Sequence, residues 1–219
     1  MIDFTLIKES LPLLLHGALV SIQIAALGAL IGILFGTLLG LAQTSKSALL
    51  RWLSTIYVTI IRGIPMLIQI LAAFYILPQL GIVLDAFWVA VVAIGFNSAA
   101  YVSQIIKAGI RSIGKGQIEA GRVLGLGNMQ ITRFIILPQA FRMVIPALGN
   151  EFITLVKDSA LASTIGVVEL TKEGIFIRGR TFDSITVFFA VACMYLIITT
   201  TLSVGINWLE RRMNQHARY

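Results

Sequence analysis

The segment LPLLLHGALVSIQIAALGALIGILFGTLLGLA, residues 11–42, contains no Asp, Glu, Lys or Arg. An α-helix needs about 20 apolar residues to cross the hydrocarbon core of a membrane, and this segment exceeds that length. Four further apolar stretches follow it, at about residues 52–77, 86–110, 134–156 and 185–209. The sequence therefore predicts an all-α polytopic membrane protein with five transmembrane helices.

The composition of the whole chain supports a membrane protein and excludes other classes. Of the 219 residues, 58% are hydrophobic and 12% are charged, whereas soluble domains carry about 25% charged residues. A disordered chain would combine low hydrophobicity with high charge, so it is excluded as well. The net charge of +7 does not come from a basic stripe on a water-soluble helix, so we expect no nucleic-acid partner. The single cysteine, Cys193, excludes an intrachain disulfide, and we expect no metal or other cofactor.

The distribution of basic residues predicts the orientation of the chain, because Lys and Arg gather in cytoplasmic loops. With the amino terminus outside, the outer segments hold only Lys8, Lys157, Lys172, Arg178 and Arg180. The inner segments then hold Lys46, Arg51, Lys107, Arg111, Lys115, Arg122, Arg133, Arg211, Arg212 and Arg218. We therefore expect the amino terminus outside and the carboxyl terminus in the cytoplasm.

Two predicted loops are longer than a turn requires, at about residues 111–132 and 158–184, and long loops often carry function. The first is predicted to be cytoplasmic and contains a short amphipathic helix over residues 117–124, with Gly125 and Gly127 as stops. Such a helix either lies in the lipid headgroups or docks into a groove of a partner.

The same region nearly matches a phosphate-binding loop, from Gly109 to Gly114-Lys115-Gly116. The match fails at Gly116, where Ser or Thr would be needed to bind magnesium, and a membrane helix precedes it instead of a strand. We therefore expect that the chain is not an ATPase.

The residues of the cytoplasmic loop carry a more specific pattern. Glu119-Ala120-Gly121 is followed after three residues by Gly125, and after nine more by Ile135, one residue and Leu137-Pro138. This closely resembles the EAA signature of ABC importer permeases, with every spacing matched. The one departure places Gly121 where a third alanine is usual; since a small residue is kept, we expect close packing to survive there. The resemblance implies that this is the coupling helix, which contacts an ATPase through Glu119, Ala120, Gly121 and Gly125.

The similarity covers nearly the whole chain and points to the branch that takes up polar amino acids, as in histidine, glutamine or arginine permeases. The stretches that carry it are Arg62-Gly63-Ile64-Pro65, residues 97–101, 137–140, 146–150 and 155–159, Ile165-Gly166-Val167, Glu169-Leu170 and residues 209–212.

The resemblance implies the architecture of a type I ABC importer permease. Residues 1–219 would form one transmembrane permease domain, with residues 111–132 as its cytoplasmic coupling loop. Five helices enclose a solute pathway poorly, so we expect a second permease subunit, identical or related, around a two-fold axis. The implied partners are two ATP-binding cassette ATPase subunits, a periplasmic or extracellular solute-binding protein, an amino acid and the lipid bilayer. The implied location is the inner (cytoplasmic) membrane.

Charged residues late in the fourth predicted span suggest the substrate. A charge in the membrane costs at least ~2.5–3.5 kcal/mol, so each needs a reason. Glu151 and Asp158 are seven residues apart and share a helix face, with Lys157 beside it. One explanation is a structural ion pair with Lys157. The functional explanation is that Asp158 accepts from a substrate ammonium, while Lys157 or free N–H groups at a helix break hold the carboxylate.

In this functional interpretation Glu151 is left for the substrate side chain, which favours arginine, lysine or histidine. Another amino acid, such as glutamine or cystine, is the alternative. Asn97, Tyr101 and Gln104 form a polar stripe on the third span that serves either helix contacts or the pathway. The substrate-binding set that we predict is Glu151, Lys157, Asp158, Asn97, Tyr101 and Ser98.

Two further patterns concern the scaffold. We expect Arg62, with Gly63 and Pro65, to support a broken helix and not to touch substrate. Small residues recur every fourth position in the first span, at Gly28, Gly32, Gly36 and Gly40, and they allow close helix packing. The sequence leaves open whether this stripe packs within the subunit or against a second copy.

Two rival functions are considered. A secondary transporter driven by an ion gradient would carry inverted repeats and ion sites, and neither is evident. A membrane scaffold without transport would have no use for Glu151, Lys157 and Asp158 together. Dependence of transport on ATP, and co-purification of an ATPase, discriminate among the three.

Overall fold

The computed structural model describes residues 2–215, apart from the side chains of residues 214 and 215. Within this range the chain is helical and contains no strand. The elements are α1 (Phe4–Thr44), α2 (Ala48–Gly63), α3 (Met66–Ile76), η1 (Leu77–Leu80), α4 (Ala86–Arg111), α5 (Lys115–Val123), α6 (Asn128–Ile131), η2 (Thr132–Ile136), α7 (Leu137–Asp158), η3 (Ser159–Ile165), α8 (Leu170–Thr181) and α9 (Ser184–Gln215).

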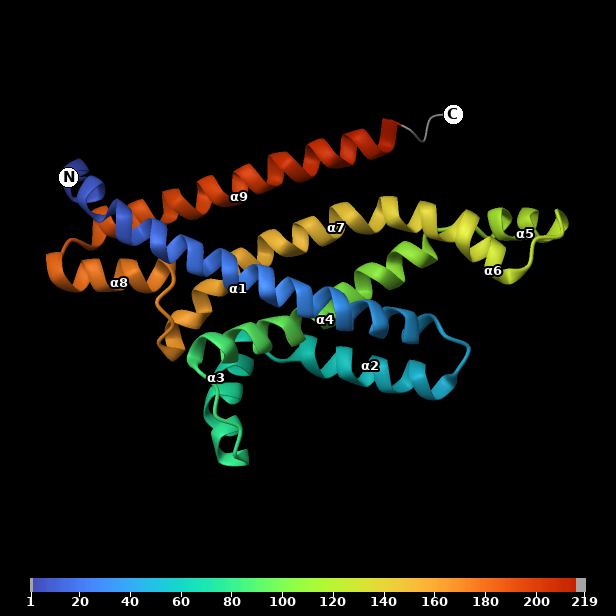
Figure 1. Cartoon of the computed structure of the whole chain (residues 1–219), viewed down its shortest axis with the longest axis horizontal. Helices are drawn as coiled ribbons and strands as arrows, with labels where there is room; N and C mark the ends of the chain where they lie inside the picture. Colours follow the sequence, from blue (N-terminus) through green and yellow to red (C-terminus); the bar gives the residue numbers. More distant parts are fainter. Residues whose placement is uncertain (1, 216–219) are drawn as a thin grey trace.

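Four of the five predicted spans form long continuous helical segments in the described residues. They are α1, α4, the run Asn128–Ile165 and α9, each long and apolar enough to cross a membrane. The second predicted span differs, because α2 and α3 meet at an angle of 101° and together form a broken span. In Figure 1, α3 turns away from the direction that α1, α2 and α4 share. The prediction of an all-α membrane protein is confirmed, with this one span broken.

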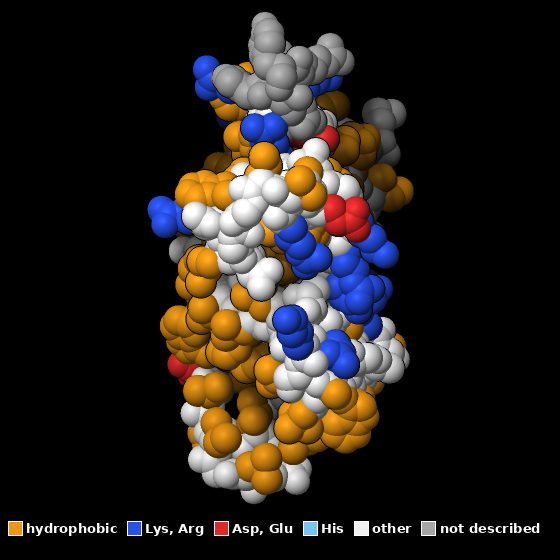
Figure 2. All heavy atoms as spheres, turned by 90° about the vertical axis from the view of Figure 1, so that its right-hand side faces the viewer, with side chains coloured by type: hydrophobic (Ala, Val, Ile, Leu, Met, Phe, Trp, Pro, Cys, Tyr) orange, Lys and Arg blue, Asp and Glu red, His pale blue; other side chains and the backbone are white. Residues whose placement is uncertain are grey.

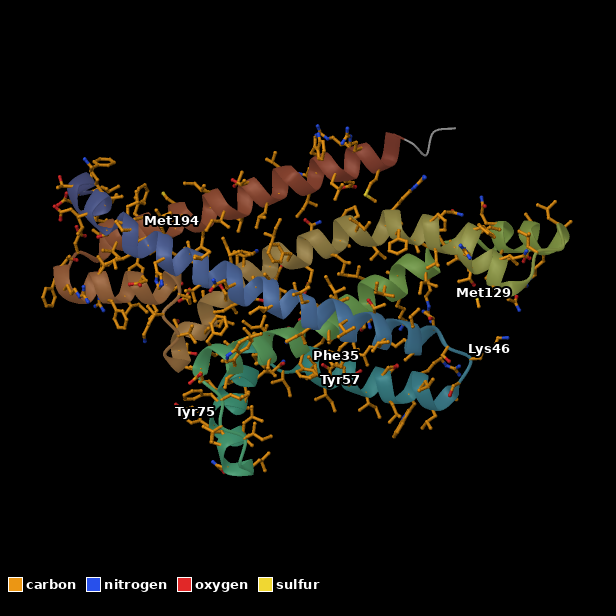
Figure 3. All side chains as sticks on the ribbon, viewed as in Figure 1. Phe35, Lys46, Tyr57, Tyr75, Met129 and Met194 are labelled. Atoms are coloured by element: carbon orange, nitrogen blue, oxygen red, sulfur yellow. The ribbon has the colours of Figure 1, made fainter. Side chains whose placement is uncertain are left out.

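The bundle has two distinct ends. The amino-terminal end of α1 lies with α8 at one end, which we call the α8 end (Figure 1). At the other, the α5 end, α5 and α6 lie together with the turn between α1 and α2; Lys46 and Met129 mark this end in Figure 3. Figure 2 views the α5 end, where Lys and Arg side chains gather and acidic ones are sparse. Of the basic residues that we expect at the inner face, Arg218 lies outside the described residues.

The stripe of glycines in α1 packs against α4 of the same chain. Gly28, Gly32, Gly36 and Gly40 are all buried. A Cβ atom built on each would meet one α4 residue in turn: Ile94, Ser98, Val102 and Ile106, at 3.0, 2.6, 2.6 and 2.8 Å. Both helices therefore advance by four residues at each contact, and the missing side chains set how closely their backbones approach. The glycine stripe of α1 therefore packs within the subunit and not against a second copy.

The opposite side of α1 carries large apolar residues that the chain leaves uncovered. Leu30, Leu34 and Leu38 are 65%, 61% and 58% exposed. In water such a row would be unfavourable, whereas in a bilayer it faces lipid tails. α1 thus uses small residues for the contact with α4 and carries leucines on the face that the chain leaves open.

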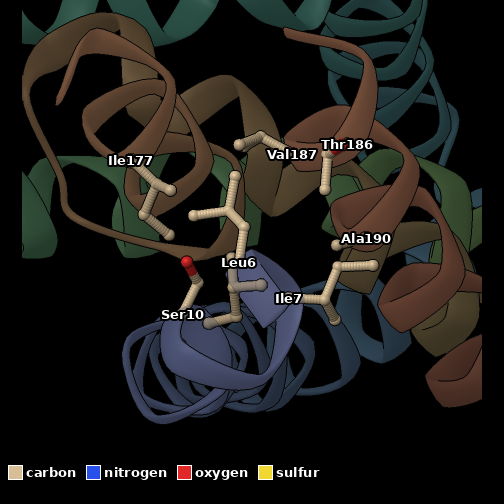
Figure 4. Close-up of a pocket in the computed structure, with 8 residues that line it drawn as sticks. Leu6, Ile7, Ser10, Ile177, Thr186, Val187 and Ala190 are labelled. Atoms are coloured by element: carbon tan, nitrogen blue, oxygen red, sulfur yellow. The ribbon is translucent and has the colours of Figure 1, made fainter. Parts of the chain in front are cut away.

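At the α8 end, the first turns of α1 pack against α8 and α9. Figure 4 shows Leu6, Ile7 and Ser10 of α1 opposite residues of these two helices around a small apolar gap. The backbone N–H of Asp3 donates to Thr186 Oγ1 at 3.0 Å. Asp3 also caps α1, since its Oδ1 accepts from the N–H of Thr5 at 2.8 Å. These contacts hold the helices of the α8 end together.

The α1–α4 contact can be tested at Gly36. A Cβ there would lie 2.6 Å from Val102 Cβ and 2.8 Å from the backbone oxygen of Ala99, and neither atom is the end of a flexible side chain. We expect Gly36→Ala to destabilise the detergent-solubilised protein by about 1–3 kcal/mol, the usual cost of overpacking. The measurement is the temperature at which the protein loses monodisperse elution.

Gly205→Ala is the matched control, because Gly205 lies in α9 and a Cβ there meets nothing within 4 Å. It should leave the transition temperature unchanged or raise it slightly, since Ala favours helix over Gly by about 1 kcal/mol. Equal behaviour of the two variants would contradict the tight α1–α4 contact.

Candidate functional site

The break in the second span is built by Arg62-Gly63-Ile64-Pro65. Pro65 has no N–H and disfavours helical geometry at the residue before it. Ile64 is accordingly extended, with φ −108° and ψ 131°. Gln69 closes the break, because its Nε2 donates to the carbonyl oxygens of Ile61 and Ile64 at 2.7 and 2.8 Å. The expectation of a broken helix at this point is confirmed.

The break also creates a helix amino terminus inside the span. The first bonds of α3 are made by the N–H groups of Ile68 and Gln69 to the carbonyl oxygen of Pro65, at 3.0 and 3.2 Å. The N–H groups of Met66 and Leu67 precede these bonds and have no partner within the helix. Such groups, together with the positive end of the helix dipole, favour a negatively charged ligand.

α4 brings polar residues to the break. Asn97 is buried at 6% exposure and Tyr101 is 39% exposed. The guanidinium carbon of Arg62 lies 5.2 Å from the centroid of the Tyr101 ring, a cation–π arrangement. Arg62 therefore reaches across from α2 to α4, a contact that the sequence interpretation did not foresee.

α7 contributes the two carboxylates. Glu151, Thr154 and Asp158 line the same cavity from one face of this helix. Ser98 of α4, which is fully buried, donates from Oγ to Glu151 Oε1 at 3.0 Å. The hydrogen bond fixes one oxygen of Glu151 and leaves the other available to a ligand.

These elements line an open cavity of about 370 Å³ between the α2–α3 break, α4 and α7, which we call the outer cavity. Ligand pockets for small molecules span about 300–1,000 Å³, so this cavity fits one amino acid. Its charged lining consists of Glu151, Asp158 and Arg62. The cavity thus has two negative groups and one positive group.

Most of the predicted substrate set meets at this cavity. Asn97, Tyr101, Glu151 and Asp158 line it, and Ser98 supports Glu151 from behind. Lys157 does not line it: its side chain is exposed and forms no salt bridge in the described part of the chain.

Sequence reasoning missed two contributors to the cavity. Thr154 lies three residues after Glu151 and four before Asp158, so helical spacing could have placed it on the same face. Arg62 was assigned only to the helix break, and its place in the cavity depends on its contact with Tyr101 of α4, which spacing along the sequence does not reveal.

The predicted cytoplasmic loop contains the expected helix. α5 spans Lys115–Val123 and ends in a Schellman motif, in which the N–H of Leu126 donates to Gly121 O at 3.0 Å. Gly125 provides the left-handed residue, with φ +78°. Gly121 is buried, and a Cβ there would approach Ile135 Cδ1 to 2.8 Å. Close packing at Gly121 is therefore present, while Glu119 and Ala120 are exposed.

The α5 end carries uncovered apolar side chains. Val123, Leu124 and Met129 are 87%, 79% and 80% exposed, and Met129 is labelled in Figure 3. Arg122 and Arg133 lie beside them in the sequence. An exposed apolar patch with a polar rim is typical of a protein contact.

At the α8 end, Glu169 organises the segment that follows η3. Its carboxylate caps α8 and accepts from the N–H groups of Thr171 and Lys172 at 2.9 and 2.8 Å, from Tyr195 Oη at 2.9 Å and from Ser21 Oγ at 3.2 Å. Burial raises the pKa of the Glu169 carboxyl above its ordinary value, although the hydrogen bonds oppose this. Glu169 therefore joins α1, α8 and α9 in a structural role.

Two other kinds of site, a metal site and a phosphate-binding loop, are not formed in the described residues. No group of three or more His, Cys, Asp or Glu that could hold a metal occurs among them. The near match to a phosphate-binding loop falls on the end of α4 and the start of α5, and Gly109 is buried in α4 against Val144. This geometry offers no cradle for a phosphate.

Comparisons with known proteins agree with this geometry. The profile of the family described as "Binding-protein-dependent transport system inner membrane component" matches residues 28–215. The glutamine transport system permease protein GlnP of Escherichia coli (strain K12) is 38% identical over 213 residues, covering 96% of this chain and 97% of that protein. The L-cystine transport system permease protein TcyB of Bacillus subtilis (strain 168) is 40% identical over 217 residues, covering 98% and 93%.

A solved structure described as an amino acid ABC transporter with histidines superposes on the chain with a TM-score of 0.92. The two share 35% sequence identity, over 97% of this chain and 99% of the other.

The role of Gln69 in the break can be tested by Gln69→Leu. The substitution leaves the carbonyl oxygens of Ile61 and Ile64 without their donor, at about 1–3 kcal/mol for each unsatisfied group. We expect a lower unfolding temperature in detergent and loss of uptake in vesicles. Gln79→Leu is the control, since Gln79 is exposed in η1 and should behave as wild type. A stable and active Gln69→Leu variant would show that the break is held by other contacts.

Proposed function

This chain belongs to the family of binding-protein-dependent transport system inner membrane components, and we propose that it is the permease subunit of an ATP-driven importer specific for basic amino acids. Its relatives are permease proteins of amino acid transport systems, so an amino acid is the substrate class from which to reason. The named substrates differ among the relatives, and the charges that line the outer cavity support a basic one.

The observation that carries the proposal is the charge of the outer cavity. Two carboxylates and one guanidinium line it, which gives a net charge of −1 when all three are ionised. A free basic amino acid carries an ammonium, a carboxylate and a cationic side chain, with a net charge of +1. Because charges in a membrane protein need partners, this substrate pairs every group, whereas a neutral amino acid leaves one carboxylate unpaired.

The positions of the charges suggest one orientation of the substrate. Asp158 accepts hydrogen bonds from the ammonium, and Glu151, held by Ser98, faces the cationic side chain. The carboxylate then lies between Arg62 and the amino terminus of α3, which supplies the free N–H groups of Met66 and Leu67. Lys157, the alternative partner for the carboxylate, stays a prediction.

Glutamine or cystine is the second candidate, because the relatives named for these substrates share 38% and 40% identity with the chain. With either of them, Glu151 has no positive partner in the cavity. The competition experiment below separates the two candidates.

The exposure of the cavity supports a second permease subunit. Arg62 and Thr154 are exposed on the single chain, and polar groups in membrane proteins face the interior of an assembly and not lipid. We propose that a second copy or a related chain covers this face, so that two bodies can rock around the pathway.

The α5 end supplies the contact with the ATPase subunit that drives transport. The exposed residues Val123, Leu124 and Met129, beside Glu119, form the surface that docks into an ATPase subunit. ATP binding by two such subunits draws the two copies of α5 together and moves the helix bundles. A loaded solute-binding protein meets the α8 end. We propose that the protein lies in the inner membrane, with the α8 end outside and the α5 end in the cytoplasm.

Substrate choice is tested by Glu151→Gln in the assembled transporter. Uptake of a labelled amino acid is measured in vesicles while unlabelled amino acids compete. Loss of a charged partner costs about 1.5–3 kcal/mol, so competition by arginine and lysine should weaken at least about tenfold (1.4 kcal/mol is one factor of ten). Competition by glutamine should not weaken.

The control is Glu9→Gln, since Glu9 is exposed near the amino terminus and should not change the competition. Unchanged competition by arginine and lysine in Glu151→Gln would remove the basic-substrate proposal. Uptake without ATP would favour a gradient-driven transporter instead.

The docking role of α5 is tested by Gly125→Val. A β-branched residue at φ +78° is strained by about 1–3 kcal/mol, so the end of α5 should rearrange and release the ATPase. Gly127→Ala is the control, because Gly127 has φ −69° and a Cβ there meets only Gln130 Oε1 at 3.7 Å. The measurement is the amount of untagged ATPase that co-purifies with the tagged permease. Equal recovery with both variants would argue against this docking surface.

A further inference from the structure

A second cavity adjoins the outer cavity on the side of the α5 end. It has a volume of about 480 Å³ and shares Arg62, Gly63 and Tyr101 with the outer cavity. Its remaining lining includes Gln43, near the end of α1, and Lys107, near the end of α4. Both helices end at the turns that lie at the α5 end (Figure 1). We call this space the inner cavity.

The inner cavity has the opposite charge from the outer one. Arg62 and Lys107 line it, and no Asp or Glu does. Two positive groups without a negative partner in the lining favour an anionic ligand. A carboxylate would therefore pair with the charges of the inner cavity, whereas a cation would be repelled.

Gln43 gives an independent sign of a missing ligand. Its side chain is 4% exposed, and its Nε2 has no hydrogen-bond partner. The oxygen of the same amide is paired: Gln104 Nε2 donates to Gln43 Oε1 at 3.0 Å and to Ser103 Oγ at 3.2 Å. The Nε2 group of Gln43 is thus a buried donor in the wall of a cavity, and buried donors are nearly always paired.

We propose that the inner cavity is a second binding site, which holds the α-carboxylate of an amino acid on the cytoplasmic side through Gln43 Nε2, Lys107 and Arg62. This rests on the proposed function in taking an amino acid as the transported solute. The same guanidinium serves both cavities, so the site receives the carboxylate of the departing substrate. An amino acid that accumulates inside occupies Arg62 from the inner side and opposes the next transport cycle.

The experiment uses the complete transporter in vesicles, with ATP inside and the solute-binding protein outside. Uptake of labelled L-arginine is compared between vesicles with an empty lumen, with luminal L-arginine and with luminal agmatine, the amine that lacks only the carboxylate. We expect luminal L-arginine to slow uptake and agmatine to have at least a fivefold weaker effect. The reported quantity is the ratio of loaded to empty rates, so a change in basal rate cancels.

Two variants test the named groups independently. Lys107→Met and Gln43→Leu should each raise the luminal L-arginine concentration that halves uptake by at least fivefold, and Lys107→Arg should restore the wild-type value. Lys46→Met and Gln23→Leu are the matched controls, because both side chains are exposed and line neither cavity. In both controls, luminal L-arginine should inhibit uptake at the same concentration as in the wild type. Use of Lys107→Met keeps the test valid if the buried Gln43→Leu variant does not fold.

The proposal is overturned if luminal L-arginine and agmatine act equally, if neither slows uptake, or if Lys107→Met retains wild-type inhibition. A transporter that takes up glutamine but not arginine refutes the basic-substrate proposal alone. The inner-cavity comparison is then made with L-glutamine and its decarboxylated amine, 4-aminobutanamide, with the same criteria.

Discussion

The close contact between α1 and α4 is the constraint on which the site depends. Gly32 lies against Ser98, so any side chain at position 32 would displace the hydroxyl that donates to Glu151. The same contact fixes the rotation of α4, and with it the direction of Asn97 and Tyr101 toward the helix break. The close packing of α1 on α4 at a glycine thus positions Ser98, and Ser98 in turn orients the carboxylate of Glu151 on α7.

The break between α2 and α3 gives this scaffold its polar centre. A bent backbone in a membrane leaves carbonyl and N–H groups that need partners. Gln69 satisfies the carbonyls, while the N–H groups at the start of α3 remain for a ligand. Arg62, two residues before Ile64, lies against Tyr101, at the wall that the outer and inner cavities share. One guanidinium therefore lies where a net negative cavity meets a positive one.

The helices, including the short helix α5, were predictable because they depend on local composition and spacing. Apolar length located the spans, and the pattern from Glu119 to Pro138 located α5. The face shared by Glu151 and Asp158 followed from helical periodicity, and both line one cavity. Neighbouring charges were harder to place: Lys157 is adjacent in sequence to Asp158 but does not line the cavity, because one residue of a helix turns the side chain by about 100°.

Contacts between distant segments were not predictable. Arg62 of α2 meets Tyr101 of α4, and the pairing of Gln43 with Gln104 joins residues 61 positions apart. The segment after Asp158 was expected as a loop, whereas it forms η3 and α8, with Glu169 as the cap. Its fold depends on Ser21 and Tyr195, which no local pattern connects to Glu169.

The central claim is that opposite charges around the α2–α3 break hold one basic amino acid in a single orientation. A structure of the assembled transporter with L-arginine bound tests it most directly. The side chain of the ligand should point to Glu151, its ammonium to Asp158 and its carboxylate to Arg62 and the start of α3. A ligand that lies elsewhere, or that turns its carboxylate toward Glu151, would contradict the claim.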